Sequence, residues 1–140
     1  MAFTSLEGTK IIVKEEGTNY MNFIASGTIV AGQAVKIAGA ASGSDQAKVQ
    51  EAGSTPESSF IGVAGFDVTS GNRVIVVVKG NKVWSRASGS VSAGDIVTAC
   101  DGGYFKTSTF GGGSGSGNIL SHGIALSDAS DDGVLKILLQ

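Results

Sequence analysis

The feature that most constrains the fold is an unbroken run of apolar β-branched residues at 74–78, enclosed by Arg73 and Lys79. The run is far too short to span a membrane as a helix. Branching at Cβ restricts the side chain and favours an extended strand. Such a strand needs cover on both faces, so we expect it in the middle of a sandwich or barrel. We also expect it to pair with the next strand, residues 82–86.

Composition supports a β fold with many turns. Glycine accounts for 22 of the 140 residues and proline for one, while charged residues make up only 16%, against about 25% in an average domain. Mean hydropathy is positive, at +0.21. A chain with so little charged surface is typical of a protein that hides further surface in an assembly.

Alternating or apolar segments separated by turn signals predict an all-β fold. The expected strands and turn-plus-strand segments are residues 10–14, 19–25, 27–37, 47–51, 60–66, 73–79, 82–86, 91–99, 104–106, 119–126 and 133–139. Glycines within 60–66 indicate a bulge or a close backbone approach. Residues 1–9, with Phe3 and Leu6 as their apolar members, are expected to form an N-terminal arm that is loose in the free subunit. A single β domain follows over residues 10–140.

Two short motifs recur in the same order and predict an internal two-fold repeat. Residues 31–35, Ala-Gly-Gln-Ala-Val, match residues 93–97, Ala-Gly-Asp-Ile-Val. Residues 61–64 with Asp67 match residues 122–125 with Asp128, again about 61 positions later. We therefore expect one pseudo-symmetric barrel built from half-repeats over about 27–79 and 89–139. The alternative is that a glycine-rich β protein reuses the same turn chemistry.

Candidates for catalysis or metal binding are sparse. His122 and Cys100 are the chain's only histidine and only cysteine, and no spacing supports a zinc site that includes both. A Cys–His nucleophile pair has no local support either. The acidic turn with Asp128, Asp131 and Asp132 lacks the length and final acid of a calcium loop, which favours a solvated turn. We expect no catalytic residues, no metal, no cofactor and no enzymatic activity.

The strand at 82–86 carries a candidate contact patch. In an extended chain Lys82, Trp84 and Arg86 share one face, and the residues between them share the other. Tryptophan and arginine are enriched at interface hot spots, so this face is a candidate interface. The alternative is an indole folded inward with the cations solvated around it. A net charge of −2 and one short patch do not favour nucleic acid as a partner.

Targeting signals are missing from the sequence. The start of the chain lacks the basic and hydrophobic parts of a signal peptide, and no run approaches the length of a membrane span. A lone cysteine excludes an internal disulfide framework. We expect a protein that is made and assembled in a cytoplasm, without a membrane partner.

The overall pattern resembles the small capsid decoration proteins of tailed phages, also called cement or head-stabilising proteins. The motifs that carry the resemblance cover residues 3–13, 61–64, 74–84, 92–97 and 122–125, together with the final apolar strand. The loops at 39–45 and 111–117 are longer than in the compact form of that family. The longer loops change the loop surfaces, and the exact contacts with a partner depend on those surfaces.

The resemblance implies a small β-barrel or β-tulip-like domain on the outer face of a phage head. It also implies a homotrimer that clamps neighbouring subunits of the major capsid protein in the virion. The interface candidates are then the apolar residues of the N-terminal region and the patch on the 82–86 strand: Phe3, Leu6, Ile11, Ile12, Val13, Lys82, Trp84 and Arg86. An arm of this kind could add a strand to a sheet edge of the capsid subunit.

A second hypothesis is a carbohydrate- or receptor-binding β module displayed on a particle surface. Trp84 and Tyr104 would be its stacking platforms. A third is a hydrolase that uses Cys100 and His122, for which we expect no activity.

Overall fold

The computed structural model describes residues 3–7, 20–39, 47–108 and 121–140. The expected strand at 10–14 and the interface candidates Ile11, Ile12 and Val13 lie outside these residues, as does the glycine-rich loop at 111–117. Strands are the main regular structure of the described part, which also contains one short 3-10 helix, η1 (Asp101–Gly103). This confirms the all-β prediction. The strands are β1 (Tyr20–Ala25), β2 (Ala34–Gly39), β3 (Lys48–Glu51), β4 (Phe60–Ala64), β5 (Arg73–Val77), β6 (Lys82–Arg86), β7 (Ile96–Ala99), β8 (Phe105–Thr107), β9 (Gly123–Ala125) and β10 (Val134–Leu139).

Strands β1 to β5 close into a barrel in the order β1-β3-β2-β4-β5, with β5 returning to β1. The pairs are antiparallel except for β1 with β3. Four residues of the apolar run 74–78 lie in β5, and three of them, Val74, Val76 and Val77, are buried. A barrel is therefore confirmed, and β5 has a neighbour on each side within it. The prediction that both half-repeats build one barrel is wrong, because β1 to β5 close the barrel by themselves.

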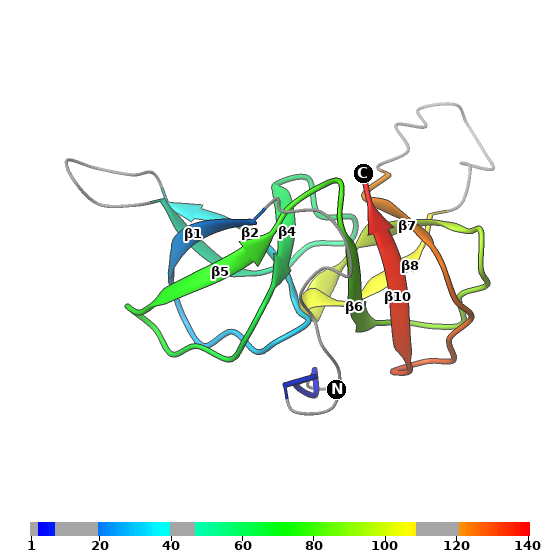
Figure 1. Cartoon of the computed structure of the whole chain (residues 1–140), viewed down its shortest axis with the longest axis horizontal. Coiled ribbons are helices and arrows are strands. Elements are labelled where there is room, and N and C mark those ends of the chain that lie inside the picture. Colours follow the sequence, from blue (N-terminus) through cyan, green and yellow to red (C-terminus); the bar gives the residue numbers. More distant parts are fainter. Residues whose placement is uncertain (1–2, 8–19, 40–46, 109–120) are drawn as a thin grey trace.

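Strands β6 to β10 form a second sheet in the order β6-β10-β9-β7-β8. This order repeats that of the first sheet, because β6, β10, β9, β7 and β8 stand where β1, β5, β4, β2 and β3 stand. Between β6 and β8 the structure records a single parallel bridge, from Ala87 to Phe105. The second sheet thus has the connectivity of the first but is not closed by a full ladder. Figure 1 shows the two groups of strands side by side along the long axis.

The same backbone hydrogen bonds recur in both sheets about 62 residues apart. The Gly32 N–H donates to the Ala64 carbonyl at 2.9 Å, and the Gly94 N–H donates to the Ala125 carbonyl at 2.8 Å. The bridge between Ile29 and Val68 has its counterpart between Val91 and Ala129. Both sheets include strands that precede the expected half-repeats, since β1 begins at Tyr20 and β6 at Lys82. The boundaries 27–79 and 89–139, and the division into arm and domain, stay a prediction.

The expected pairing of the apolar strand with the Trp84 strand is wrong. β5 pairs with β1 and β4, whereas β6 pairs with β10. The turn at Gly80 and Asn81 carries the chain from one sheet to the other. The Gly80 N–H donates to the Leu139 carbonyl at 2.9 Å, so the turn is fastened to the end of β10.

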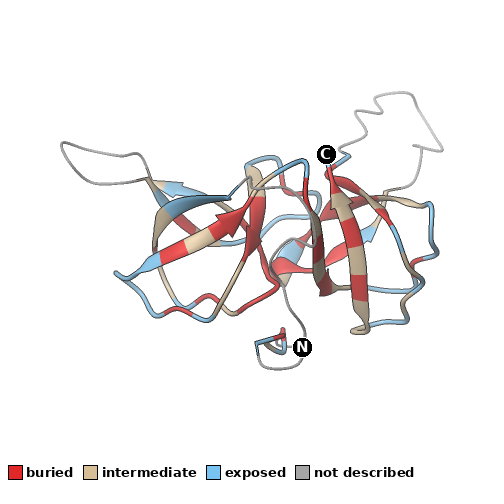
Figure 2. Ribbon diagram, in the orientation of Figure 1, coloured by how far each residue is buried: buried red, intermediate tan, exposed pale blue. Residues whose placement is uncertain are grey.

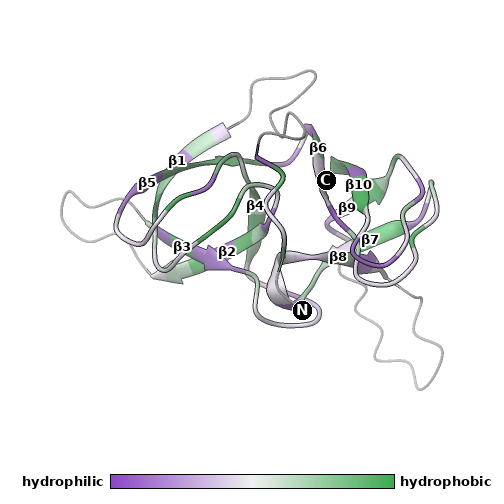
Figure 3. Ribbon diagram, turned by 90° about the horizontal axis from the view of Figure 1, so that it is seen from below, coloured by the Kyte–Doolittle hydropathy of each residue, from purple (hydrophilic) through white to green (hydrophobic). Residues whose placement is uncertain are grey.

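Apolar side chains form two large clusters. Buried and apolar stretches occur in both groups of strands, as the ribbons coloured by burial and by hydropathy show (Figures 2 and 3). One cluster fills the first barrel and includes Ile29, Val35, Val74 and Val76. The other fills the second sheet but also takes in residues of the first sheet and its loops: Leu6, Ala31, Ala34, Ala52, Val63 and Val77. The first barrel therefore has a core of its own, while the core of the second sheet is completed by its neighbour.

Candidate interaction surfaces

Residues 3–7 pack against both sheets, which contradicts the prediction of a loose arm for this segment. Leu6 is fully buried in the shared cluster, and its N–H donates to the Ala31 carbonyl at 3.1 Å. Gly32 makes room for it, because a Cβ at that position would lie 2.8 Å from Leu6 Cδ1. The ring of Phe3 packs at 5.0 Å from that of Tyr104. Phe3 and Leu6 are thus buried in the chain's own core, and their role at an interface stays a prediction.

Two carboxylates fasten this segment to the first barrel. The Asp67 carboxylate accepts hydrogen bonds from the Ser5 hydroxyl at 2.5 Å and from the Ala31 N–H at 2.9 Å. The Glu7 carboxylate accepts one from the Asp67 N–H at 2.7 Å. The segment therefore contributes anionic oxygens at the surface while its apolar side chains point inward.

The alternation predicted for β6 is confirmed. Val83 and Ser85 are buried, whereas Lys82, Trp84 and Arg86 are partly exposed on the opposite face. The Trp84 indole lies on that outer face, and the Lys136 Nζ of the neighbouring β10 is 5.4 Å from the ring centroid. A cation over an indole is a favourable contact. Trp84 is partly exposed and also packs against the shared apolar cluster, so it lies between the two arrangements that the sequence leaves open.

Arg86 has a structural role within the chain. Its Nε–H donates to the Thr4 carbonyl and its Nη1–H to the Asp132 carbonyl, both at 2.8 Å. One guanidinium thus joins the N-terminal segment to the turn before β10. Ser85, on the inner face, donates its hydroxyl to the Gly32 carbonyl at 2.6 Å and joins the two sheets directly.

His122 lies at the junction of the two sheets. Its ring stacks on Phe60 with 4.4 Å between centroids and 26° between planes, and its Nδ1 accepts from the Ala99 N–H at 2.8 Å. An accepting Nδ1 places the proton of the neutral imidazole on Nε2. Burial lowers the pKa of His122, and the Glu57 carboxylate raises it in part. The structural reading of this histidine therefore fits its contacts.

Cys100 does not have the surroundings of a nucleophile. The side chain is buried, its thiol contacts the Tyr104 carbonyl at 3.4 Å, and burial raises the pKa of the thiol. A reactive cysteine needs the thiolate, which a lowered pKa favours. His122 Nδ1 is meanwhile engaged by a backbone N–H. These contacts do not fit an activated Cys–His pair.

The acidic turn at 128–132 is hydrogen-bonded, and is not simply solvated. Asp128 accepts from the Ala93 N–H at 2.8 Å, and Asp131 accepts from the Gly89 N–H at 2.7 Å. Asp132 accepts from the Tyr104 hydroxyl at 3.2 Å. The carboxylates thus fix the loop that precedes β7. No group of three His, Cys, Asp or Glu side chains suited to a metal ion occurs in the described part of the chain.

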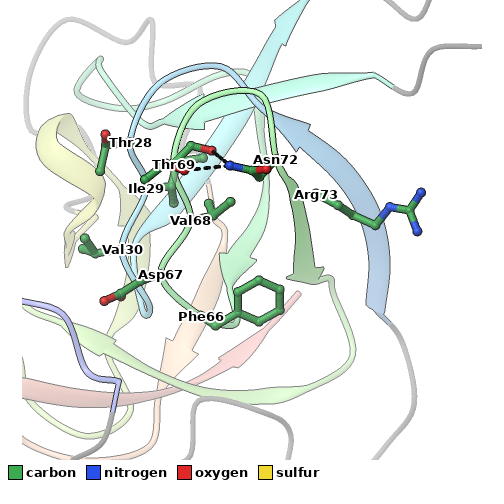
Figure 4. Close-up of a pocket in the computed structure, with 9 residues that line it drawn as sticks. All are labelled: Thr28, Ile29, Val30, Phe66, Asp67, Val68, Thr69, Asn72 and Arg73. Carbon is green, nitrogen blue, oxygen red and sulfur yellow. Dashed lines mark hydrogen bonds between the residues drawn. The ribbon is translucent and has the colours of Figure 1, made fainter.

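A shallow apolar groove of about 550 Å³ opens on the first barrel (Figure 4). It lies between the loops that follow β1 and β4. The lining residues are Thr28, Ile29, Val30, Phe66, Asp67, Val68, Thr69, Asn72 and Arg73. Asn72 is held to Thr69 by two hydrogen bonds, at 2.7 and 3.3 Å, which shape one rim. Arg73 extends away from the other lining side chains, while Asp67 lies at the opposite end.

No helix within the described residues is both long and apolar enough to cross a membrane.

The fold defines a class: an all-β protein of two five-stranded sheets with a shared core. A solved structure with a similar fold is the N base of the head fiber gp8.5 of bacteriophage phi29. The two folds superpose with a TM-score of 0.61 over 87% of this chain and 93% of that chain. Sequence identity is 16%, so the likeness concerns the fold. No family model and no curated protein sequence matches the chain.

Proposed function

We propose that the chain is a structural protein of a phage virion that binds the outer surface of the assembled capsid. There it stabilises contacts between subunits of the major capsid protein, and it assembles with further copies of itself as a homotrimer. The observation that carries the proposal is the fold likeness to a phage head fiber base over nearly the whole length of both chains. The motifs that resemble phage capsid decoration proteins point the same way.

The surface chemistry agrees with a binding role. The outer face of β6 carries the partly exposed Trp84 and Arg86, and tryptophan and arginine are enriched at interface hot spots. The buried thiol and imidazole are engaged by backbone groups. The proposal assigns no catalysis, cofactor, nucleic acid or membrane partner to the chain.

A carbohydrate-binding module receives less support from the structure. Tyr104 is only 5% exposed and its ring packs at a tilt against that of Phe3, so its ring is closed to a sugar. Trp84 already has the Lys136 ammonium over its ring. The two stacking platforms that this hypothesis needs are thus occupied within the chain.

The test is cosedimentation of the purified protein with assembled, expanded heads of the phage that encodes it. Isolated major capsid protein subunits serve as the comparison. We expect tighter binding to heads, because many sites on one shell add their weak contacts. Heads with bound protein should also melt at a higher temperature, since a ligand of the native state stabilises it. Equal affinity for heads and isolated subunits, or no binding to either, would refute the proposal.

A further inference from the structure

The N-terminal segment covers the Ala-Gly turn that precedes β2. Ala31 and Gly32 are both buried. The Ala31 carbonyl accepts a hydrogen bond from the Leu6 N–H at 3.1 Å, and a Cβ on Gly32 would lie 2.8 Å from Leu6 Cδ1. The Asp67 carboxylate accepts the Ser5 hydroxyl. We call this turn, together with Asp67, the first seat, because it holds an extended segment through its backbone, a leucine and a hydroxyl group.

The second sheet repeats this turn before β7. The Ala93 N–H donates to the Asp128 carboxylate at 2.8 Å, and the Ser92 N–H donates to the Asp95 carboxylate at 2.9 Å. In the first seat the equivalent N–H groups donate to a carboxylate and to an amide oxygen, both at 2.9 Å. The glycines of the two turns have nearly the same φ, 93° and 92°. We call residues 92–95, together with Asp128, the second seat.

The surface that is covered in the first seat is exposed in the second. Ala93 and Gly94 are both exposed, and no group of the described residues donates a hydrogen bond to the Ala93 carbonyl. A Cβ on Gly94 would meet no described atom within 4 Å. Leu126, 39% exposed, directly follows Ala125, whose carbonyl accepts the Gly94 N–H. The second seat therefore presents a backbone acceptor, a carboxylate and an aliphatic side chain at the surface.

The second seat is more acidic than the first. Four aspartates lie in it or in the loop beside it: Asp95, Asp128, Asp131 and Asp132. Asp95 takes the place of the neutral Gln33 of the first seat. None of the four forms a salt bridge with a described residue. Arg86 approaches only the last of them, through a hydrogen bond to its carbonyl. A segment that fits here should therefore carry a cation where the N-terminal segment carries Glu7.

We propose that the second seat binds an extended peptide segment of a partner protein, in which a serine or threonine is followed by a long aliphatic residue and then by a lysine or arginine. The aliphatic side chain lies over Gly94, its N–H donates to the Ala93 carbonyl, and the hydroxyl donates to Asp128. The second sheet completes the cover of Leu6 at the first seat, and the partner provides that cover here. The partner's identity as a head protein rests on the proposed function, whereas the peptide site does not.

A second copy of this chain is not the occupant that the chemistry favours. Its N-terminal segment is held in its own first seat, where Leu6 is fully buried. That segment also carries Glu7 directly after the leucine. In the second seat this carboxylate would approach Asp95 and Asp128, and like charges across an interface are costly.

Titration of the full-length, nitrogen-15-labelled protein with two synthetic peptides tests the site by nuclear magnetic resonance. One is Ala-Phe-Thr-Ser-Leu-Lys-Gly, and the other has glutamate in place of lysine and so reproduces residues 2–8. The basic peptide should shift the amide signals of Gly94 and Asp128 and leave those of Gly32 and Asp67 unchanged. It should bind about fivefold more tightly than the acidic one, as expected for reversing one surface charge contact. Salt should reduce that difference.

Gly94→Ala should block the seat, because its Cβ takes the space of the incoming aliphatic side chain. Binding of the basic peptide should weaken at least about tenfold. Gly89→Ala is the matched control, since this glycine of the same loop also has positive φ, 78°, and open space around it. It should bind like the wild type. If Gly94→Ala fails to fold, a basic peptide with alanine in place of leucine should show the same loss on the unchanged protein.

Shifts at Gly32 and Asp67 in place of those at Gly94 and Asp128 would mean that the peptide displaces the N-terminal segment, and would overturn the second seat. Tighter binding of the acidic peptide would overturn the charge assignment and favour a second copy as the occupant. No saturable shift with either peptide would refute the site altogether.

Cosedimentation with heads separates this inference from the proposed function. Peptide binding by a protein that does not bind heads would sink only the capsid role. Head binding that is equal in wild type and Gly94→Ala, together with no peptide binding, would sink only the second seat.

Discussion

His122 occupies in the second sheet the position that Ile61 holds in the first, one residue before the equivalent glycines Gly62 and Gly123. Replacing an aliphatic side chain by an imidazole gives this position a ring that stacks on Phe60 and an acceptor for the Ala99 N–H. Both contacts cross or flank the junction of the sheets. A single residue thus makes the junction sensitive to protonation.

We expect stability to fall as pH is lowered from 7.5 to 5.5. Burial holds the folded-state pKa of His122 below its ordinary value, so the unfolded chain binds a proton first, and stability is lost below an unfolded pKa of about 6.5. The slope should reach at most about 1.4 kcal/mol per pH unit. Urea unfolding at three pH values measures it, with His122→Asn as the control that retains an acceptor but does not titrate. An equal slope in that variant would contradict the assignment.

Glu57 is the carboxylate that acts on the pKa of His122, but its own titration does not overlap the pH range of this measurement. Burial alone would raise the pKa of Glu57, but the N–H groups of Gly53, Ser59 and Ser54, together with Lys36, hold it below its usual range. The stability that Glu57 contributes is therefore present above its unfolded pKa and is lost only as pH falls further, through the folded pKa. Its loss lies below pH 5.5, outside the window used for His122.

Gly62 should not tolerate even a methyl group. A Cβ there would collide with the Val77 carbonyl oxygen and would lie 2.7 Å from Val76 Cγ1, where β4 closes the barrel against β5. We expect Gly62→Ala to lower the free energy of unfolding by about 3 kcal/mol, the upper end of overpacking costs. Gly53→Ala is the control, because its nearest neighbour is the flexible end of Lys36 at 3.7 Å. Thermal and urea unfolding measure both, and equal stabilities would refute the close approach.

At the scale of elements, the recurring unit is an Ala-Gly turn fastened by an aspartate. Asp67 accepts from the Ala31 N–H, and Asp128 accepts from the Ala93 N–H, at 2.9 and 2.8 Å. Gly32 and Gly94 both have positive φ, at 93° and 92°, which a side chain would disfavour. The same aspartate-fastened turn therefore occurs twice, before β2 and before β7, and it sets the direction of the strand that follows.

The N-terminal segment is the element whose role differs most from expectation. Leu6→Ala should cost about 2 to 4 kcal/mol, as for a leucine removed from a core, because the side chain is fully buried between the sheets. Thr4→Ala is the control, since Thr4 is exposed and offers Arg86 only its carbonyl. Denaturant unfolding of the two variants checks this. Equal free energies of unfolding for Leu6→Ala and wild type would contradict this burial and support the predicted loose arm.

The local sequence pattern predicts where most strands lie, but it does not predict which strands pair. Each of β1 to β10 overlaps a segment that alternation and turn residues predict, although β2 runs two residues beyond 27–37 and β8 one residue beyond 104–106. The outward face of β6 follows from its two-residue period. The partners of β5 do not follow, because the short turn at Gly80 and Asn81 has the form of a hairpin yet joins two sheets. The burial of Phe3 and Leu6 could not be predicted either, because two apolar residues in a short polar segment do not show which surface they pack against.

On the scale of the whole molecule, the first sheet closes into a barrel, and the apolar core of the second sheet is completed by residues of the first. We expect a fragment of residues 1–79 to fold by itself, because its barrel and core are its own. A fragment of residues 80–140 should remain unfolded, because its core lacks Leu6, Ala34, Val63 and the other contributions of the first sheet. Circular dichroism and cooperative unfolding of each fragment measure this. A cooperative transition in the isolated second fragment would contradict it.

The single bridge between β6 and β8 has a consequence for the order of events during synthesis. A ribosome releases the first barrel before the strands of the second sheet exist. The surface that the second sheet requires, with Val63 and Val77 at its centre, is then already in place when β6 to β10 emerge. The half of the chain that is synthesised first is also the half on which the other depends for its core. The second sheet can therefore fold against the first barrel as it emerges. A circular permutant that begins at β6 would reverse that order and should fold more slowly and aggregate more during expression.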